Sequence, residues 1–161
     1  MNSHQNQVLK TWIAAGLWMV LIAIESTSYL SSANTGQILY PFFRFLFGLD
    51  PLRFAVWHHY LRKTGHFVGY FTLSLLLFRA WKATLSSASI WELRWAAIAF
   101  FMSAFVGSMD EFHQTFLPSR TGLASDAILD STAALIAQIV IFVVMRLWGA
   151  RTRQEEVVPV G

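Results

Sequence analysis

The sequence contains no cysteine, and few of its residues are charged. Among 161 residues, 13% are Asp, Glu, Lys or Arg, whereas a typical soluble domain has about 25%. Without cysteine the chain has no disulfide, no thiolate metal site and no cysteine nucleophile. The net charge of +3 is small, and the basic residues are scattered along the chain instead of being clustered. This distribution argues against a nucleic-acid-binding protein.

Apolar residues are abundant instead. They make up 55% of the chain and include 14 Phe and 7 Trp. A soluble domain of this size buries only about two-thirds of the surface that its unfolded chain exposes, which is too little to hide so many apolar side chains. Aromatic side chains also suit the boundary between lipid and water. The composition therefore predicts an integral membrane protein.

Four apolar stretches lie at residues 8–30, 64–81, 90–109 and 124–148. The uninterrupted apolar part of each is shorter than the roughly 20 residues that an isolated transmembrane helix needs, and polar residues complete the length. We therefore expect an all-α fold, an integral membrane four-helix bundle within one domain at residues 1–150. The charged tail at residues 151–161 is expected to be disordered.

The first stretch could instead be a secretory signal peptide, because Lys10 precedes an apolar run and small residues follow it at 31–33. Glu25 within the run argues against this alternative, and so do the three apolar stretches that follow it.

The segment between the first two stretches, residues 38–60, is too polar to cross a membrane and too aromatic to be a free loop. Pro41 and Pro51 are expected to divide it into short pieces, and each piece carries one Arg among Phe, Leu and Trp. This pattern predicts one or two helices that either lie in the membrane interface or re-enter it.

The orientation follows from counting basic residues on alternate sides of four spans. One side has seven: Lys10, Arg79, Lys82, Arg94, Arg146, Arg151 and Arg153. The other side has five: Arg44, Arg53, Arg62, Lys63 and Arg120. The positive-inside rule then places both termini in the cytoplasm.

The polar residues within or beside the spans gather at one end of the predicted bundle. With four alternating spans, one set of helix ends falls on the same side whichever way the protein is oriented. This set comprises Glu25, Lys63, His66, Asp110, Glu111, Gln114, Arg120, Asp126 and Asp130. We expect these side chains to form one polar site.

Helical spacing refines this expectation. His66 and Tyr70 are four residues apart and share a helix face, as do Asp126 and Asp130. A carboxylate as deep as Asp130 costs a few kcal/mol unless it is paired or hydrated. Its natural partners are Lys63, His66 and Arg120.

Each of these residues also has a simpler interpretation. Arg62 and Lys63 could extend to lipid headgroups. Asp126 could serve only at its helix N-terminus, with Ser125 as a candidate cap. His66 could be an ordinary hydrogen-bonded interior histidine, and the acidic pair at 110–111 could be solvated.

Two blocks of residues resemble the signatures of the VanZ-like family. Residues 63–70, Lys-Thr-Gly-His-Phe-Val-Gly-Tyr, resemble its K-x-x-H-F-x-x-Y motif. Residues 110–120, Asp-Glu-Phe-His-Gln-Thr-Phe-Leu-Pro-Ser-Arg, followed by Asp126 and Asp130, resemble its second block, D-E-x-x-Q-x-x-x-P-x-R with D-x-x-x-D/N. Ala133 stands where members commonly carry Gly, which alters helix packing but leaves the polar site unchanged.

The resemblance implies a multi-pass protein of the bacterial cytoplasmic membrane. The founding member of the family is associated with low-level resistance to the glycopeptide teicoplanin, which points to the cell envelope. It does not identify a reaction, because a family likeness is an association and not a mechanism. The expected partners are membrane lipids or lipid-linked envelope precursors.

Three functions fit these residues. The first is binding or protection of a lipid-linked or lipid-like envelope molecule at the outer face, through Lys63, Arg120, Gln114, Asp110, Glu25 and Tyr70. The second is an enzyme acting on a lipid headgroup, with acid–base groups His66, Asp126, Asp130 and Glu111. The third is a small proton-coupled transporter, although its titrating groups lie near one surface. No cofactor is assigned; a divalent metal, with Glu111 as one ligand, and the oligomeric state are both left open.

Overall fold

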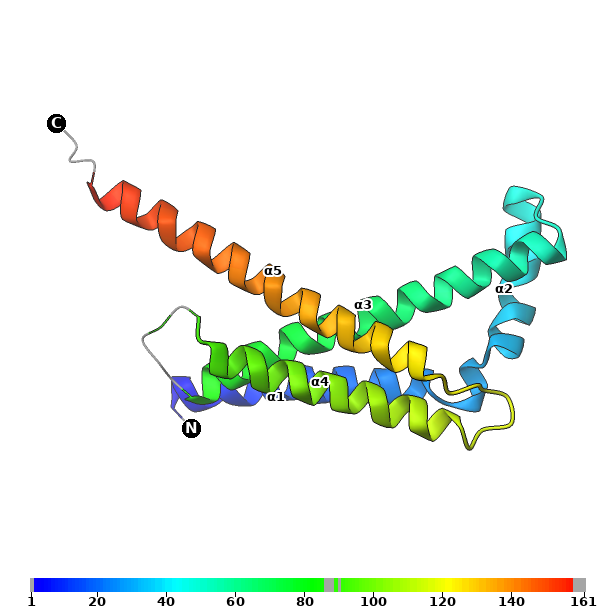
Figure 1. The fold of residues 1–161 in the computed structure, drawn as a ribbon, viewed down its shortest axis with the longest axis horizontal. Helices are drawn as coiled ribbons and strands as arrows, with labels where there is room; N and C mark the ends of the chain where they lie inside the picture. The colour runs from blue at the N-terminus through cyan, green and yellow to red at the C-terminus, as the bar shows by residue number, and fades with distance from the viewer. Residues whose placement is uncertain (1, 86–88, 90, 158–161) are drawn as a thin grey trace.

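The computed structural model describes residues 2–85, 89 and 91–157, and these residues form helices and connecting loops without a β-strand (Figure 1). The all-α prediction is confirmed. The helices are α1 (Ser3–Glu25), the short 3-10 helix η1 (Ser28–Leu30), α2 (Ser32–Phe47), α3 (Pro51–Leu85), α4 (Leu93–Gln114) and α5 (Ala124–Val157).

Local sequence explains where α2 and α3 meet. The Ser31 hydroxyl accepts a hydrogen bond from Asn34 N–H and caps α2 at its start, and Gly48, with φ of 64°, ends it in the left-handed region. The Asp50 carboxylate then accepts hydrogen bonds from the N–H groups of Leu52 and Arg53 at the start of α3. Capping and glycine chemistry therefore produce a sharp helix–turn–helix at residues 48–50.

The segment at 38–60 differs from its prediction. Pro41 lies inside α2 and does not divide it, because the capped ends at Ser31 and Gly48 define the helix on both sides of the proline. Residues 51–60 are the first turns of α3 and continue into the predicted second span. They form no separate short helix, because after Pro51 no further proline interrupts the helix before Leu85.

The central helix of the fold is α3. It packs against α1, α4 and α5, and its N-terminal end packs against α2. Small buried residues on α4 (Ala96, Ala99, Ser103 and Gly107) and on α5 (Ala133, Ala134 and Ala137) permit close approach of the helices. The larger buried side chains Leu73, Leu77, Phe78 and Trp95 fill the space between them.

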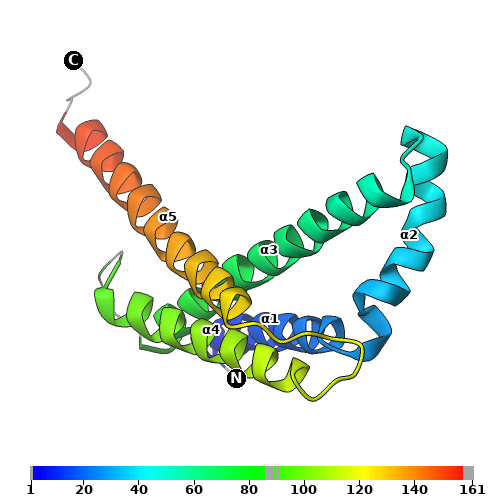
Figure 2. The same cartoon turned by 45° about the vertical axis from the view of Figure 1, so that its right-hand side comes forward.

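Figures 1 and 2 show that two parts extend beyond this packed region. The helix α2 and the N-terminal half of α3 project to one side, and the C-terminal half of α5 projects to the other. The helix α5 includes residues 151–157, where the sequence predicts a disordered tail; Gln, Glu and Arg are good helix formers, so the helix continues. Residues 158–161 lie outside the described part of the chain.

Much of the outer surface is apolar. Leu9, Ile13, Leu17, Val20 and Leu21 of α1 are all exposed. Among the described residues, two helices are long and apolar enough to cross a membrane, α1 (Ser3–Glu25) and the Ala124–Gly149 part of α5. The four predicted crossings are therefore not confirmed, and crossing by α3 and α4 stays a prediction.

Candidate functional site

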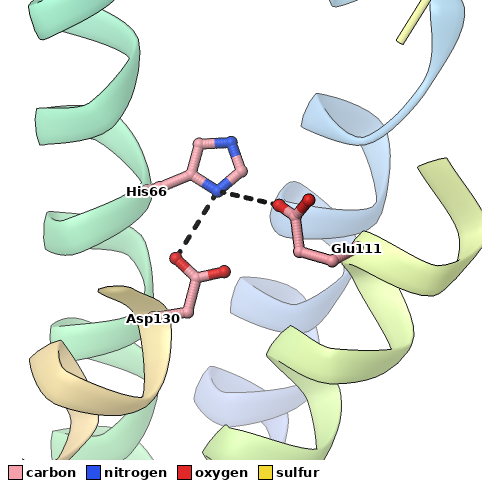
Figure 3. Close-up of side chains that lie close together, drawn as sticks. All are labelled: His66, Glu111 and Asp130. Atoms are coloured by element: carbon pink, nitrogen blue, oxygen red, sulfur yellow. Dashed lines mark ion pairs between the residues drawn. The ribbon is translucent and has the colours of Figure 1, made fainter. Parts of the chain in front are cut away.

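Three helices bring one histidine and two carboxylates together. His66 comes from α3, Glu111 from α4 and Asp130 from α5. The Nδ1 atom of His66 lies 3.5 Å from Asp130 Oδ1 and 3.9 Å from Glu111 Oε1. Figure 3 shows both carboxylates directed toward this nitrogen. We refer to these three residues as the His66 cluster.

The His66 cluster is almost closed to solvent. Asp130 has no exposed surface and Glu111 is 4% exposed, while the His66 side chain keeps 20% of its surface. Within the described residues, His66 Nδ1, Glu111 Oε1 and both oxygens of Asp130 have no hydrogen-bond partner. Buried carboxylates without such partners are costly, so their charge needs compensation by a cation or a proton.

The backbone around the His66 cluster positions its carboxylates. Leu123 N–H donates a 3.0 Å hydrogen bond to Glu111 Oε2, which orients that side chain from the loop between α4 and α5. A Cβ atom on Gly107 would lie 3.0 Å from Asp130 Cβ, so glycine permits α5 to approach α4 here. Tyr70 donates a 3.0 Å hydrogen bond to Asp110 Oδ2 beside the same contact.

Lys63 and Asp126 form an ion pair between α3 and α5, and both side chains are partly buried. Asp126 also accepts a 3.1 Å hydrogen bond from the Ser125 hydroxyl. Lys63 therefore neutralises Asp126 near the start of α5, and His66 contacts Asp130 one turn further along the helix. Of the three partners predicted for Asp130, His66 is the one in contact.

Arg120 makes main-chain contacts that the sequence did not predict. It is 9% exposed, and its guanidinium donates to main-chain carbonyl oxygens: Nη2 donates to Thr27 at 3.0 Å and also to Glu25. These bonds tie the loop between α4 and α5 to the end of α1. Glu25, predicted as a site carboxylate, supplies its main-chain carbonyl to this contact.

Gly122 closes the same loop over α4. A Cβ atom at this position would collide with the main-chain carbonyl oxygen of Glu111. The predicted residue Gln114 is 3% exposed, and its Nε2 atom has no hydrogen-bond partner within the described residues. Both residues lie where the loop covers the polar end of the bundle.

A pocket of about 320 Å³ opens beside the His66 cluster. It is lined by Ser32, Ala55, His59, Arg62, Lys63, His66, Gln114, Ser119, Arg120, Thr121, Leu123 and Asp126. Three of these side chains carry a permanent positive charge, Arg62, Lys63 and Arg120, and one carries a negative charge, Asp126. We call it the cationic pocket. Arg62 donates a 3.0 Å hydrogen bond to the carbonyl oxygen of Leu30. This acceptor is uncharged, so the bond does not neutralise the guanidinium.

His58 was not among the residues singled out from the sequence. His58 is 5% exposed and lies between α2 and α3, within 3.1 Å of Thr35 Oγ1 and stacked on Phe54. Burial, and secondarily the nearby Arg62 charge, lower the pKa of the His58 imidazole. Its spacing of four residues from Phe54 and Arg62 was the available signal.

Two further features carried little signal in the sequence. Ser26 Oγ and His113 Nδ1 share a hydrogen bond of 3.3 Å that joins the end of α1 to α4. Gly107 looks like any small residue in an apolar helix, and its contact with Asp130 depends on how α4 and α5 pack.

Comparison with known proteins identifies a matching family. The protein family described as VanZ/LLP1 matches residues 11–146, which is most of the chain and includes every residue of the His66 cluster. No curated protein and no solved structure matches the chain.

Proposed function

The chain belongs to the VanZ/LLP1 family, and on this basis we propose that it is a membrane protein that binds the anionic headgroup of a lipid-linked envelope molecule in the cationic pocket. The family and the two apolar helices together indicate a membrane protein. The ligand, and the position of the pocket at the outer face with both termini in the cytoplasm, are parts of the proposal.

The charge of the cationic pocket carries this proposal. Lys63 is offset by Asp126, but Arg62 and Arg120 donate to uncharged carbonyl oxygens and keep their positive charge. The lining therefore has an excess of positive charge at a partly buried position. Phosphate groups are natural ligands for such a site, because guanidinium groups match their oxygen geometry.

The surface beside the cationic pocket suits the lipid part of such a molecule. The helices α2 and α3 supply Ser32, Ala55 and His59 to the pocket lining, and large apolar side chains are exposed on α2 and the first turns of α3: Ile38, Phe42, Phe45, Leu52, Val56 and Trp57. A headgroup held in the pocket would leave its hydrocarbon chain against this face. The resistance association of the founding VanZ-like protein agrees with a ligand of this kind, since teicoplanin carries an acyl chain.

The test compares two ligands that share a polyprenyl chain and differ in whether it carries an anionic headgroup. A polyprenyl pyrophosphate and the corresponding uncharged polyprenol are titrated against the purified protein in nanodiscs. We expect the pyrophosphate to bind at least about tenfold more tightly, since a hydrogen bond to a charged group contributes about 1.5–3 kcal/mol. Equal affinity for the two compounds would contradict the proposal.

Matched variants locate the binding site. Arg62→Gln removes the charge but keeps a donor for the Leu30 carbonyl, and we expect it to lose most of the preference for pyrophosphate. Arg53→Gln is the control, because Arg53 lies on the same helix with 77% of its side chain exposed and pairs with Asp50. Equal loss in the two variants would indicate a general surface-charge effect and reject the pocket.

A second candidate is an enzyme that acts on the same headgroup. The observation in its favour is the position of His66, which lines the cationic pocket and also contacts two buried carboxylates. Such an imidazole can transfer a proton to a bound headgroup. Mass spectrometry of the lipid after incubation tests this: an altered headgroup with wild-type protein but not with His66→Gln would favour the enzyme.

A further inference from the structure

We propose that the His66 cluster binds one divalent transition-metal ion, held by His66 Nδ1, Glu111 Oε1 and Asp130 Oδ1. This inference goes beyond headgroup binding and does not rest on it. The site would lie inside the helix bundle, whereas the cationic pocket opens beside it.

The geometry of the three atoms supports a metal site. One ligand atom from each residue lies within 4.8 Å of the other two, and His66 Nδ1 lies 3.5 Å from Asp130 Oδ1 and 3.9 Å from Glu111 Oε1. Metal–ligand bonds of about 2.0–2.2 Å place neighbouring ligand atoms about 3–4 Å apart. Small side-chain rotations would therefore bring all three atoms into a shared coordination sphere.

The missing hydrogen bonds are a second, independent observation. Four buried atoms of the cluster have no hydrogen-bond partner among the described residues: His66 Nδ1, Glu111 Oε1 and both carboxylate oxygens of Asp130. The ligand atoms of the proposed site are thus among the buried atoms that lack partners. One divalent cation would compensate both buried negative charges, whereas a protonated imidazole at His66 would compensate only one.

The ligand types select the kind of ion. One imidazole nitrogen with two carboxylate oxygens suits Zn²⁺, Mn²⁺ or Fe²⁺, whereas Ca²⁺ and Mg²⁺ prefer oxygen ligands alone. Three protein ligands leave at least one coordination position open. Because His66 also lines the cationic pocket, that position would be within reach of a molecule bound there.

Surrounding contacts already orient the ligands. Glu111 Oε2 accepts the Leu123 N–H hydrogen bond, which leaves Oε1 directed toward His66. The close approach of Gly107 restrains Asp130. Contacts of this kind typically change metal affinity by 10–100-fold when they are removed.

The experiment measures metal directly. Full-length protein in detergent is stripped with EDTA, dialysed separately against Mn²⁺ and Zn²⁺, desalted, and analysed by mass spectrometry for metal content. We expect about one ion per chain with at least one of the two metals. Wild-type protein that is folded by circular dichroism and retains neither ion would overturn the proposal.

Variants then identify the ligands. Asp130→Asn and Glu111→Gln keep the side-chain shape, and we expect each to weaken binding of the retained ion at least about tenfold; for Mn²⁺ the titration follows the signal of the free ion by electron paramagnetic resonance. Glu92→Gln is the control for Glu111→Gln, since Glu92 lies just before the same helix and pairs with Arg94. Metal binding that is equal in wild type and both cluster variants would place the ion elsewhere and reject the site. If protonated carboxylates stand in place of a metal, wild-type protein leaves the signal of free Mn²⁺ undiminished.

Discussion

A Cβ atom on Gly107 would lie 3.0 Å from the Cβ atom of Asp130 and 3.4 Å from a ring carbon of Tyr70. Glycine at this position therefore determines how closely α4 approaches α5, and with it where the Asp130 carboxylate lies. Because Asp130 is fully buried, it cannot move toward solvent to relieve a clash.

We predict that Gly107→Ala destabilises the protein although alanine is the better helix former. Overpacking of a tight contact typically costs about 1–3 kcal/mol, which exceeds the roughly 1 kcal/mol gained from helix propensity. Gly16→Ala is the control, because a Cβ there meets no atom within 4 Å. Thermal unfolding in detergent should show a lower Tm for Gly107→Ala and an unchanged or higher one for Gly16→Ala. The reverse order would show that the contact is not tight.

The ion pair between Lys63 and Asp126 should contribute more to stability than an exposed pair. Its side chains are 29% and 17% exposed, whereas those of the pair between Arg53 and Asp50 are 77% and 52% exposed. In double-mutant cycles with alanine, we expect a coupling of about 1–3 kcal/mol for the partly buried pair and a clearly smaller coupling for the exposed pair. Reversible unfolding measures both, and equal couplings would contradict the prediction.

The VanZ-like resemblance, inferred from two short blocks, is confirmed by the family match over residues 11–146. The apolar stretches also located four helices, α1, α3, α4 and α5, because hydrophobic runs report helices regardless of how these pack. The boundary between α2 and α3 was harder to predict from the sequence. Pro41 seemed a helix breaker, but the capped ends at Ser31 and Gly48 define α2 instead.

The pairing of charges could not be read from the sequence. Spacing on one helix shows that Asp126 and Asp130 share a face, but the cation opposite each depends on the rotation and crossing of α3 and α5. The structure pairs Lys63 with Asp126 and places His66 beside Asp130. The partners of Arg120 were harder still to predict, because they are main-chain carbonyl oxygens. Every residue has such an oxygen, so the residue type does not reveal the contact.

Arg120 should hold the loop between α4 and α5 against the end of α1. We predict that Arg120→Ala increases hydrogen exchange in residues 115–123 and 26–31 together, because the guanidinium bonds join these two segments. Losing hydrogen bonds to a charged group should destabilise the protein by about 1.5–3 kcal/mol. Arg94→Ala is the control, since Arg94 is exposed and pairs with Glu92 at the opposite end of the bundle. An exchange increase confined to one of the two segments would argue against the link.

The contact between α2 and α3 should weaken in mild acid because of His58. Burial first, and the Arg62 charge second, lower the pKa of this imidazole below 6.5, so the unfolded chain binds its proton at a higher pH than the folded chain. Stability is therefore full above about pH 6.5 and is lost progressively as the pH falls toward the folded pKa. The two ring nitrogens contact the hydroxyls of Ser32 and Thr35 on α2, and protonation converts the one acceptor nitrogen of the neutral ring into a donor. We expect hydrogen exchange of α2 to accelerate as the pH falls from 7.5 to 5.5, after correction for the intrinsic rate.

The variant His58→Gln should lose most of this pH dependence. His59→Gln, which changes an exposed histidine, should retain it. A pH dependence that survives in His58→Gln would assign the effect to another group.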